Sequence, residues 1–239
     1  NYTFVLGFEQ DFEQSSIRGW MDTNWISICS WATAAYLVFI FSVQSYMKDR
    51  QPFGLRTPLM LWSLSLALFS IIGACRVWPE FIHTFYNKGL YSTVCVPSFL
   101  EDDHVTALWT WFFVLSKLPE LVDTVFIVLR KQQLIFLHWY HHVTVLWFAW
   151  YSYVEFTATC RWFMVMNYSV HALMYSYYAV KALKIPVPKV LAMVITSLQL
   201  LQMVFGCGVN ILAWRYKANG RDCAVSTNNL YWSFLMYTS

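Results

Sequence analysis

Charged residues are scarce in this sequence. Only 12% of its 239 residues are Asp, Glu, Lys or Arg, and 58% are hydrophobic. Soluble domains carry about 25% charged residues, so this composition excludes an ordinary soluble globular protein. Glycine and proline are also few, with eight and seven residues, and there is no internal repeat or low-complexity tract. We therefore predict a single domain over residues 1–239, whose surroundings are a lipid bilayer and not nucleic acid.

The hydrophobic residues are collected in long runs without a formal charge. Each run is close to the roughly 20 residues that an α-helix needs to cross a bilayer core. The uninterrupted runs are 23–47, 57–75, 132–154, 162–180 and 190–214. A sixth segment, 105–129, contains Lys117, Glu120 and Asp123, and a shorter seventh begins after Asp222. The sequence predicts an all-α, polytopic membrane protein with seven transmembrane helices, truncated at its C-terminal end.

The connecting segments differ in charge on the two sides of the predicted membrane. Loops 48–56, 130–131 and 181–189 together have a net charge of +7, whereas the longer segments of the opposite side have a net charge of −3. Short cytosolic loops of membrane proteins carry an excess of Lys and Arg. We therefore predict that these loops are cytosolic, with the N-terminus in the lumen and the C-terminus in the cytosol.

Two further features belong to the predicted luminal side. Asn1 begins the triplet NYT, an N-glycosylation sequon, and is a predicted glycosylation site. Cys95, Cys160 and Cys223 lie on the same side, where disulfides can persist. Three cysteines allow three pairings, and the residues alone do not choose among them.

Polar residues of four apolar segments lie at one depth. His141, Glu120, His171 and Gln199 are each about nine or ten positions from the predicted cytosolic end of their segment, which is roughly 15 Å at the rise of an α-helix. An ionisable group near the middle of a membrane is by default a candidate functional residue. We therefore predict a functional site in this layer.

Spacing within each segment places the polar residues on a shared helix face. The candidate site residues are Lys117, Glu120, Asp123, His138, His141, His142, Asn167, His171, Tyr175, Gln199 and Gln202. Polar side chains in membranes also form hydrogen bonds and ion pairs that only join helices. Such a role accounts for the two glutamines, or for a Lys117–Glu120 pair. It does not account for four histidines at matching depth.

The four intramembrane histidines could serve metal binding or covalent chemistry. Membrane-bound desaturases and hydroxylases bind iron through HxxHH-type motifs, but they use many more ligands, and this sequence has no second such motif. We therefore predict no metal. A neutral imidazole can instead act as a nucleophile or a general base, and a dry site protects an acyl-imidazole from water. A receptor or transporter is a third interpretation, although the repeat symmetry of many transporters is missing. His83 and His104 fall in a predicted luminal loop and are expected to be surface residues.

Four motifs follow one another along the chain. They are KLPELVDT (117–124), HWYHH (138–142), NYSVHALMYSYY (167–178) and TSLQLLQ (196–202). In order and spacing they resemble the motif set of the ELO family of very-long-chain fatty acid elongases, and the resemblance covers essentially the whole chain. HWYHH and NYSVHA are most similar to the animal branch that extends saturated and monounsaturated acyl chains, whereas Gln133 is more similar to the polyunsaturated branch.

The resemblance implies a condensing enzyme of the endoplasmic reticulum membrane. Such an enzyme joins a long-chain acyl-CoA to malonyl-CoA, releases CO2 and CoA, and leaves a 3-oxoacyl-CoA two carbons longer. The resemblance further implies that six of seven helices enclose a narrow substrate tunnel and that no cofactor is required. The expected partners are the reductases and dehydratase of the elongation cycle, and a second copy of the chain in a homo-oligomer.

The resemblance also implies roles for individual residues, carried over by position. His141 corresponds to the acylated nucleophile and His171 to its catalytic partner across the tunnel. The hydrogen-bonding shell that fixes their tautomers consists of His138, His142, Asn167, Glu120 and Asp123. A disulfide between Cys95 and Cys223 is implied in the same way, which leaves Cys160 free.

CoA is a polyanion and cannot enter the hydrocarbon region, so its phosphates are expected on cations at the cytosolic mouth. We predict that CoA contacts Arg130, Lys131, Lys181, Lys184 and Lys189. For any one of these residues the alternative explanation is that it only enforces topology. Lys117 lies deeper, where it either reaches the pyrophosphate or pairs with Glu120.

Overall fold

The computed structural model describes residues 2–238, so the predicted glycosylation site at Asn1 lies outside the described residues. Within this range all regular secondary structure is helical. The elements are α1 (Gly7–Gln10), α2 (Gln14–Tyr46), α3 (Arg56–Cys95), α4 (Ser98–Glu101), α5 (His104–Ser116), the 3-10 helix η1 (Pro119–Leu121), α6 (Val122–Leu129), α7 (Phe136–Val154), α8 (Cys160–Ala182), α9 (Lys189–Ala218) and α10 (Thr227–Thr238). The predicted all-α class is therefore confirmed.

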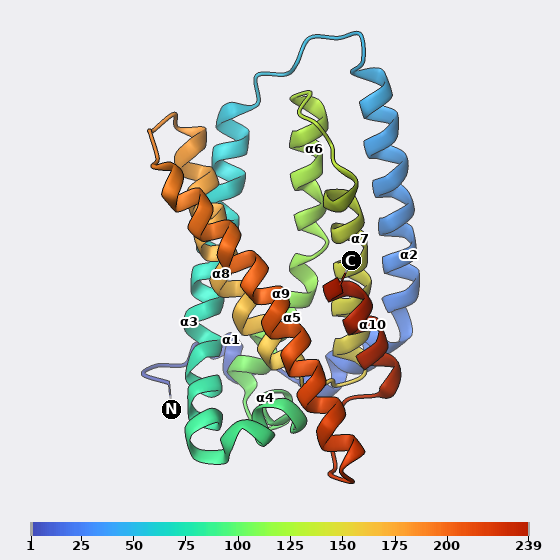
Figure 1. The fold of residues 1–239 in the computed structure, drawn as a ribbon, viewed down its shortest axis with the longest axis vertical. Helices are drawn as coiled ribbons and strands as arrows, with labels where there is room; N and C mark the ends of the chain where they lie inside the picture. The colour runs from blue at the N-terminus through green and yellow to red at the C-terminus, as the bar shows by residue number, and fades with distance from the viewer. Residues whose placement is uncertain (1, 239) are drawn as a thin grey trace.

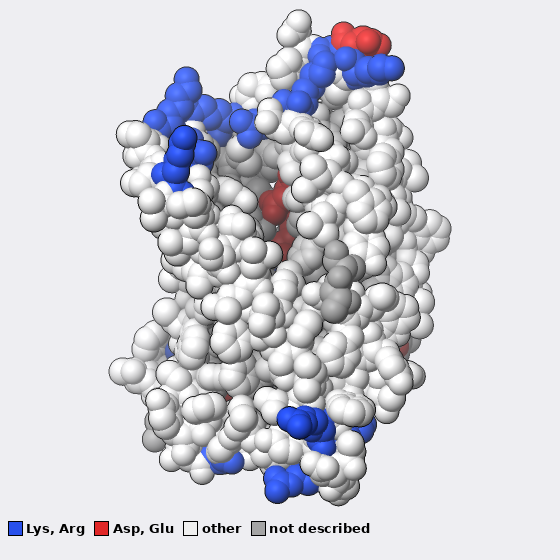
Figure 2. Space-filling model, in the orientation of Figure 1, with Lys and Arg blue, Asp and Glu red and all other residues white. Residues whose placement is uncertain are grey.

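The long helices run along the long axis of the molecule (Figure 1). Helices α2 and α3 lie on opposite sides, and α9 crosses diagonally over the face seen in Figure 1. Loops 47–55, 130–135 and 183–188 meet at one end, where Figure 2 shows a band of Lys and Arg side chains. We call this the basic end. The opposite end, which contains α4 and the last turns of α3 and α9, is called the disulfide end for the bond described below.

Among residues 2–238, three helices are long and apolar enough to cross a membrane. They are α2, α3 and α9. Large apolar side chains on the outer faces of α2 and α9 are exposed, among them Trp31, Val38, Leu200 and Val204. Exposed apolar surface of this extent is typical of contact with lipid. The structure thus supports a multi-pass membrane protein, and the count of seven transmembrane helices stays a prediction.

Helix α3 is longer than the sequence analysis predicted. Residues 76–95, expected as a loop, continue the helix, so this expectation was wrong. Gly89 has a φ of 80°, a left-handed conformation that glycine adopts without steric cost. The chain kinks at Gly89, whose φ and ψ are not helical, and a short helical stretch then continues to Cys95. His83 lies on this extension and is exposed, as predicted.

The predicted span 105–129 is interrupted in the middle. Helix α5 ends at Ser116, and η1 begins at Pro119 before α6 continues the direction of the chain. Proline lacks a backbone N–H and its ring clashes with the carbonyl four residues earlier, so it breaks a helix interior. Lys117 and Glu120 lie at this break and are buried. The broken helix therefore holds ionisable side chains inside the bundle.

Helices α3 and α8 pack along much of their length. The close approach requires Gly73, because a Cβ atom there would lie 2.4 Å from the Tyr168 ring. The Tyr168 hydroxyl donates a hydrogen bond to the carbonyl of Trp109 on α5. One aromatic side chain thus ties three helices together next to the candidate site.

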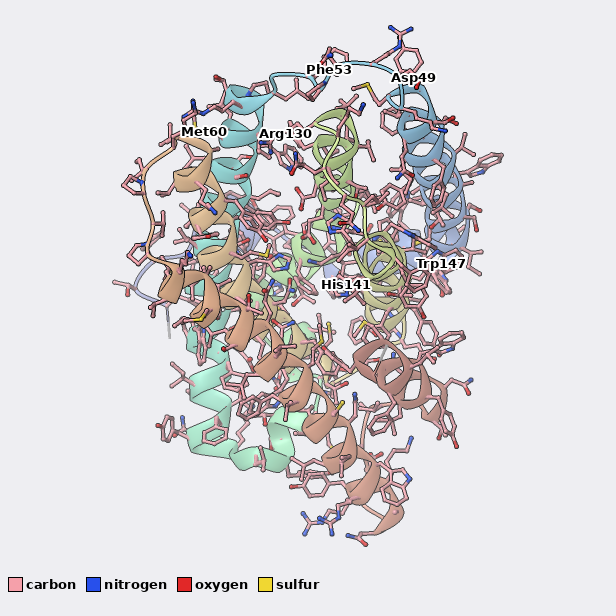
Figure 3. The ribbon with its side chains drawn as sticks, turned by 45° about the horizontal axis from the view of Figure 1, so that its top comes forward. Asp49, Phe53, Met60, Arg130, His141 and Trp147 are labelled. Atoms are coloured by element: carbon pink, nitrogen blue, oxygen red, sulfur yellow. A yellow bond between two sulfur atoms is a disulfide. The ribbon has the colours of Figure 1, made fainter. Side chains whose placement is uncertain are left out.

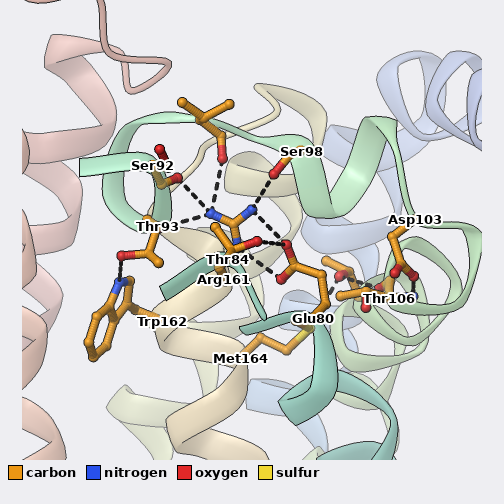
Figure 4. Close-up of polar contacts among 12 residues, drawn as sticks. Glu80, Thr84, Ser92, Thr93, Ser98, Asp103, Thr106, Arg161, Trp162 and Met164 are labelled. Atoms are coloured by element: carbon orange, nitrogen blue, oxygen red, sulfur yellow. Dashed lines mark hydrogen bonds and ion pairs between the residues drawn. The ribbon is translucent and has the colours of Figure 1, made fainter. Parts of the chain in front are cut away.

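A buried arginine organises the disulfide end (Figure 4). The Arg161 side chain is fully buried and donates two hydrogen bonds of 3.0 Å to the Glu80 carboxylate. Its remaining N–H groups donate to the Ser98 hydroxyl and to the carbonyls of Ser92, Thr93 and Val96. The guanidinium therefore fixes the turn that joins α3 to α4 against α8. In the sequence, Arg161 contributes only one of the charges that were counted on the predicted luminal side.

A second buried ion pair anchors the N-terminal segment. The Glu9 carboxylate accepts hydrogen bonds from Arg76, from Trp109 and from the backbone of Leu6. Burial raises the pKa of Glu9, but these donors outweigh burial, and the net pKa lies below the ordinary value. The N-terminal segment is thus held by a carboxylate that must stay ionised.

This pair should make stability depend on pH. Because the folded pKa of Glu9 is lowered, its contribution is complete above the unfolded value of about 4.3 and is lost as the pH falls through the folded pKa. We expect Glu9→Gln to lower the thermal unfolding midpoint at pH 7 and to differ less from wild type at acidic pH. Midpoints measured in detergent from pH 3 to 7 test this. A difference between the two proteins that does not change with pH would contradict it.

A disulfide joins the end of α3 to the segment that precedes α10. It links Cys95 to Cys223, the pairing that the family resemblance implies. Cys160 has a free, buried thiol. The backbone of Ala224 also donates to the Cys95 carbonyl, so the two segments are held by both covalent and hydrogen bonds.

Candidate active site

A cavity of about 590 Å³ lies among α3, α6, α7, α8 and α9. Figure 2 shows a hollow below the basic end, with acidic atoms at its bottom. In Figure 3, Arg130 lies nearer the basic end than His141. The cavity brings together twelve predicted site residues, which are Lys117, Glu120, Asp123, Arg130, His138, His141, His142, Asn167, His171, Tyr175, Lys181 and Gln199.

The remaining predicted site residues lie elsewhere. Gln202 lines a smaller pocket next to the cavity. Lys184 and Lys189 do not line the cavity. The Lys131 ammonium donates hydrogen bonds of 2.9 Å to the carbonyls of Lys48 and Arg50. Lys131 therefore holds the loop after α2, which is a structural use of its charge.

Two carboxylates, the buried Glu120 and the half-buried Asp123, form part of the cavity wall. Glu120 accepts hydrogen bonds from Lys117, at 2.7 Å, and from the Ser116 hydroxyl, at 2.8 Å. Asp123 accepts from the Trp62 indole at 2.7 Å and from the Tyr175 hydroxyl at 2.6 Å. Buried charges are tolerated when they are paired and hydrogen-bonded. The two acids are thus held in place by groups from α3, α5 and α8 and by Lys117, which follows α5 directly.

A chain of polar contacts leads from Glu120 to His171. The Lys117 ammonium donates to Glu120 and, at 3.1 Å, to the side-chain oxygen of Asn167. The Asn167 amide nitrogen lies 3.1 Å from Nε2 of His171, one turn further along α8. Nδ1 of His171 lies 3.9 Å from the Glu120 carboxylate, which is too long for a hydrogen bond. The chain fixes the His171 ring at one of its two nitrogens.

His138 is fixed from the other side of the bundle. Its Nε2 atom lies 3.0 Å from the Thr124 hydroxyl, which is itself 2.8 Å from the Tyr36 hydroxyl. The His138 ring also packs edge-on against His142, with ring centroids 4.5 Å apart. His138 thus holds the opening turn of α7 against α6 and α2.

His141 differs from these two histidines. Within residues 2–238 no hydrogen bond joins either nitrogen of its ring to another side chain or to the backbone, whereas His138 and His171 each have one. It lines the main cavity and also a second pocket of about 50 Å³. His141 is therefore placed between two spaces with ring nitrogens that remain available.

The second pocket is mostly apolar and continues from His141 toward α10. Its lining residues include Phe113, Phe148, Phe163, Met203, Met236 and Tyr237. The side-chain oxygen of Gln202 also faces this region, where it is buried and has no hydrogen-bond partner among the described residues. A polar space near the basic end and an apolar space beyond it thus meet at His141.

The described part of the chain offers no obvious metal site. Among residues 2–238, no three His, Cys, Asp or Glu side chains are grouped closely enough to hold a metal ion. The expectation that no metal takes part stays a prediction, and elemental analysis of the purified protein tests it.

Comparison with known proteins identifies the family. Residues 20–239 match the model of the ELO: GNS1/SUR4 family. The chain belongs to the ELO family. The family recognition made from the four motifs is therefore confirmed.

Several ELO proteins of animals are similar over nearly the whole chain. Very long chain fatty acid elongase 6 of Drosophila melanogaster is 51% identical over 241 aligned positions, covering 100% of this chain and 76% of its own length. The Gallus gallus protein of the same name is 48% identical and covers 97% and 86%. Very long chain fatty acid elongase 3 of Mus musculus is 43% identical and covers 95% and 83%.

Two residues that support the cavity lining of this ELO protein could not be recognised from the sequence. Trp62, on α3, donates a hydrogen bond to Asp123. Tyr36 is hydrogen-bonded to Thr124, whose hydroxyl contacts Nε2 of His138. Each of these residues contributes one polar atom, carried by an aromatic side chain within an apolar segment. Because the chain contains 13 Trp and 15 Tyr, no spacing or motif separates these two from residues that face lipid.

Proposed function

We propose that this chain is a very-long-chain fatty acid elongase that condenses a long-chain acyl-CoA with malonyl-CoA. Membership of the ELO family and the names of the relatives support the elongase assignment. The position of His141 carries the finer proposal, because its free ring nitrogens lie where a polar cavity meets an apolar pocket. This is where a thioester joins a polar CoA to an apolar acyl tail.

The two spaces fit the two halves of the substrate. The cavity near the basic end is lined by Arg130 and Lys181, which attract the phosphates of CoA. The apolar pocket beyond His141 accepts the first part of the acyl tail. We further propose that six of seven transmembrane helices extend this pocket into a tunnel when a tail is bound.

In the first step a ring nitrogen of His141 attacks the thioester carbonyl. The carbonyl carbon bonds to nitrogen, the carbon–sulfur bond breaks, and the thiolate of CoA takes the proton that the imidazole loses. An acyl-imidazole and free CoA result. Only a neutral imidazole is a nucleophile, and the apolar surroundings of α7 favour the neutral form.

In the second step malonyl-CoA enters and loses CO2. The resulting enolate carbon bonds to the acyl carbonyl carbon, and the carbon–nitrogen bond to His141 breaks. The departing ring nitrogen takes up a proton from solvent through the open end of the cavity, which restores the neutral imidazole. The product is a 3-oxoacyl-CoA two carbons longer. Hydrogen-bond donors of the cavity wall, His171 among them, stabilise the developing enolate oxygen.

The proposal includes the cellular setting expected of such an enzyme. We place the chain in the endoplasmic reticulum membrane, with the N-terminus in the lumen, the C-terminus in the cytosol and the basic end facing the cytosol. The long-chain 3-oxoacyl-CoA would be consumed by reductases and a dehydratase, which are its proposed partners, and the chain would form a homo-oligomer.

A product assay tests the proposed reaction. Purified protein is incubated with a series of saturated and monounsaturated long-chain acyl-CoAs and with malonyl-CoA, and the products are identified by mass spectrometry. We expect 3-oxoacyl-CoA species two carbons longer, together with CO2 release that requires both substrates. Repeated turnover of acyl-CoA without malonyl-CoA, beyond the single acylation of each protein molecule, would contradict the proposal.

The cations of the cavity should contribute to substrate binding. We expect Arg130→Ala and Lys181→Ala to raise the KM for acyl-CoA more than they lower kcat, because phosphates are bound alike in the ground state and the transition state. Lys88→Ala is the matched control, since Lys88 is an exposed cation of the disulfide end and does not line the cavity. Equal KM values in all three variants and wild type would show that the phosphates bind elsewhere.

A further inference from the structure

The direction of the Asn167 side chain is decided by its neighbours. Lys117 has only hydrogen-bond donors on its ammonium group, and it lies 3.1 Å from Oδ1 of Asn167. The carbonyl oxygen of the amide must therefore face Lys117. The amide nitrogen then faces His171, from which it is 3.1 Å away.

This orientation determines where His171 carries its proton. An amide nitrogen is only a donor, so Nε2 of His171 must accept and cannot carry a hydrogen. In the neutral ring the proton is then on Nδ1. Nδ1 is 3.9 Å from Glu120 and has no hydrogen-bond partner among residues 2–238, and His171 lines the cavity.

The position of Lys117 is itself fixed. Its ammonium lies 2.7 Å from Glu120 and 4.4 Å from the centroid of the Phe113 ring, and its side chain is only 2% exposed. An ion pair held in this way cannot rotate freely away from the amide. The sequence also allowed the Lys117–Glu120 pair as a simple link between helices. In the structure this pair determines the orientation of Asn167 and, through it, the protonation site of His171 on α8.

We propose that Lys117 and Asn167 are positioning residues that hold His171 as the Nδ1–H tautomer, so that His171 serves the reaction as a hydrogen-bond donor and not as a base. This deepens the proposed function and rests on it for the role of the donor, which is to bind the enolate oxygen formed from malonyl-CoA. According to this proposal, His141 and His171 have different chemical roles. His141 uses a free lone pair, whereas the lone pair of His171 is occupied by Asn167.

Nitrogen NMR tests the tautomer directly. Protein labelled with 15N-histidine is reconstituted in lipid, and the His171 signals are assigned by their loss in His171→Gln. We expect a protonated Nδ1 and an unprotonated Nε2. In Asn167→Asp the carboxylate is an acceptor, so Nε2 should become protonated. Gln199→Glu is the matched control, because it adds the same charge to the cavity wall but contacts Met174 and not His171; it should leave the His171 signals unchanged.

Kinetics test the consequence of the tautomer. In Asn167→Leu the ring loses its fixed orientation, and we expect kcat for condensation to fall by about tenfold or more, with little change in the KM for acyl-CoA. Formation of an acyl adduct with acyl-CoA alone should persist, because that step uses His141. A protonated Nε2 in wild type, or an Asn167→Asp protein whose Nε2 stays unprotonated, overturns the tautomer assignment. Absence of any adduct in wild type, with the expected NMR signals, instead overturns the acyl-histidine mechanism and leaves the assignment standing.

Discussion

His141→Ala should abolish both the formation of an acyl adduct and the release of CoA from acyl-CoA alone. Wild-type protein given a long-chain acyl-CoA without malonyl-CoA should gain the mass of one acyl group in place of a hydrogen and release an equal amount of CoA. The reason is that, in the proposed mechanism, the imidazole of His141 is the nucleophile of the first step. Intact-protein mass spectrometry and a thiol assay measure the two events.

Two other variants separate this role from general damage. His171→Ala should still form the adduct but condense poorly, whereas His83→Ala, which changes an exposed histidine of α3 far from the cavity lining, should behave as wild type. Initial-rate plots for the two substrates should be parallel, as in ping-pong kinetics. Intersecting plots without any adduct would make His141 a general base in a direct condensation.

Arg161→Met should be among the most destabilising single changes in the protein. The substitution leaves Glu80 buried without its partner and removes the donors of three backbone carbonyls. Breaking a buried ion pair in this way costs about 3–5 kcal/mol, which corresponds to a fall of at least about 6 °C in Tm for a chain of this size. The loss of the monodisperse peak in size-exclusion chromatography after heating measures it.

A matched control is available on α3. Lys88 is an exposed cation of the same end, and Lys88→Met should leave Tm within about 1 °C, since exposed charges contribute little. The double variant Arg161→Met with Glu80→Leu should be more stable than Arg161→Met alone, because it no longer buries an unpaired carboxylate. A double variant that is less stable than the single one would show that the charge pair is not the reason.

The sequence predicted the residues of the cavity better than their contacts. Depth along a helix depends only on position in the chain, so His141, His171, Glu120 and Gln199 could be placed in one layer, and all four line the same cavity. Contacts between helices depend on rotation and on neighbours that are distant in sequence. The hydrogen bond from Trp62 to Asp123 therefore could not be predicted from the sequence.

The formal charge of a residue was the least reliable guide to its individual role. Lys131 and Arg161 were recognised by their side of the membrane, but Lys131 binds carbonyls of the loop after α2 and Arg161 is fully buried. Net charge depends on numbers of residues and is insensitive to what each side chain contacts. The break at Pro119 could have been predicted from the residue itself, whereas the continuation of α3 beyond Arg76 could not, because Arg76 is accommodated by Glu9 from a distant segment.

The disulfide has a consequence for biosynthesis. Cys95 and Cys223 are 128 positions apart, and apart from Leu59 and Ser63 every residue that lines the main cavity lies between them. During synthesis Cys95 emerges long before its partner, so the bond closes only after α9 has been made and inserted. Until then Cys95 lacks its disulfide partner, and afterwards a covalent loop encloses the segment that supplies most of the cavity lining. Oxidation of this pair therefore marks a chain in which every helix from α4 to α9 has been made.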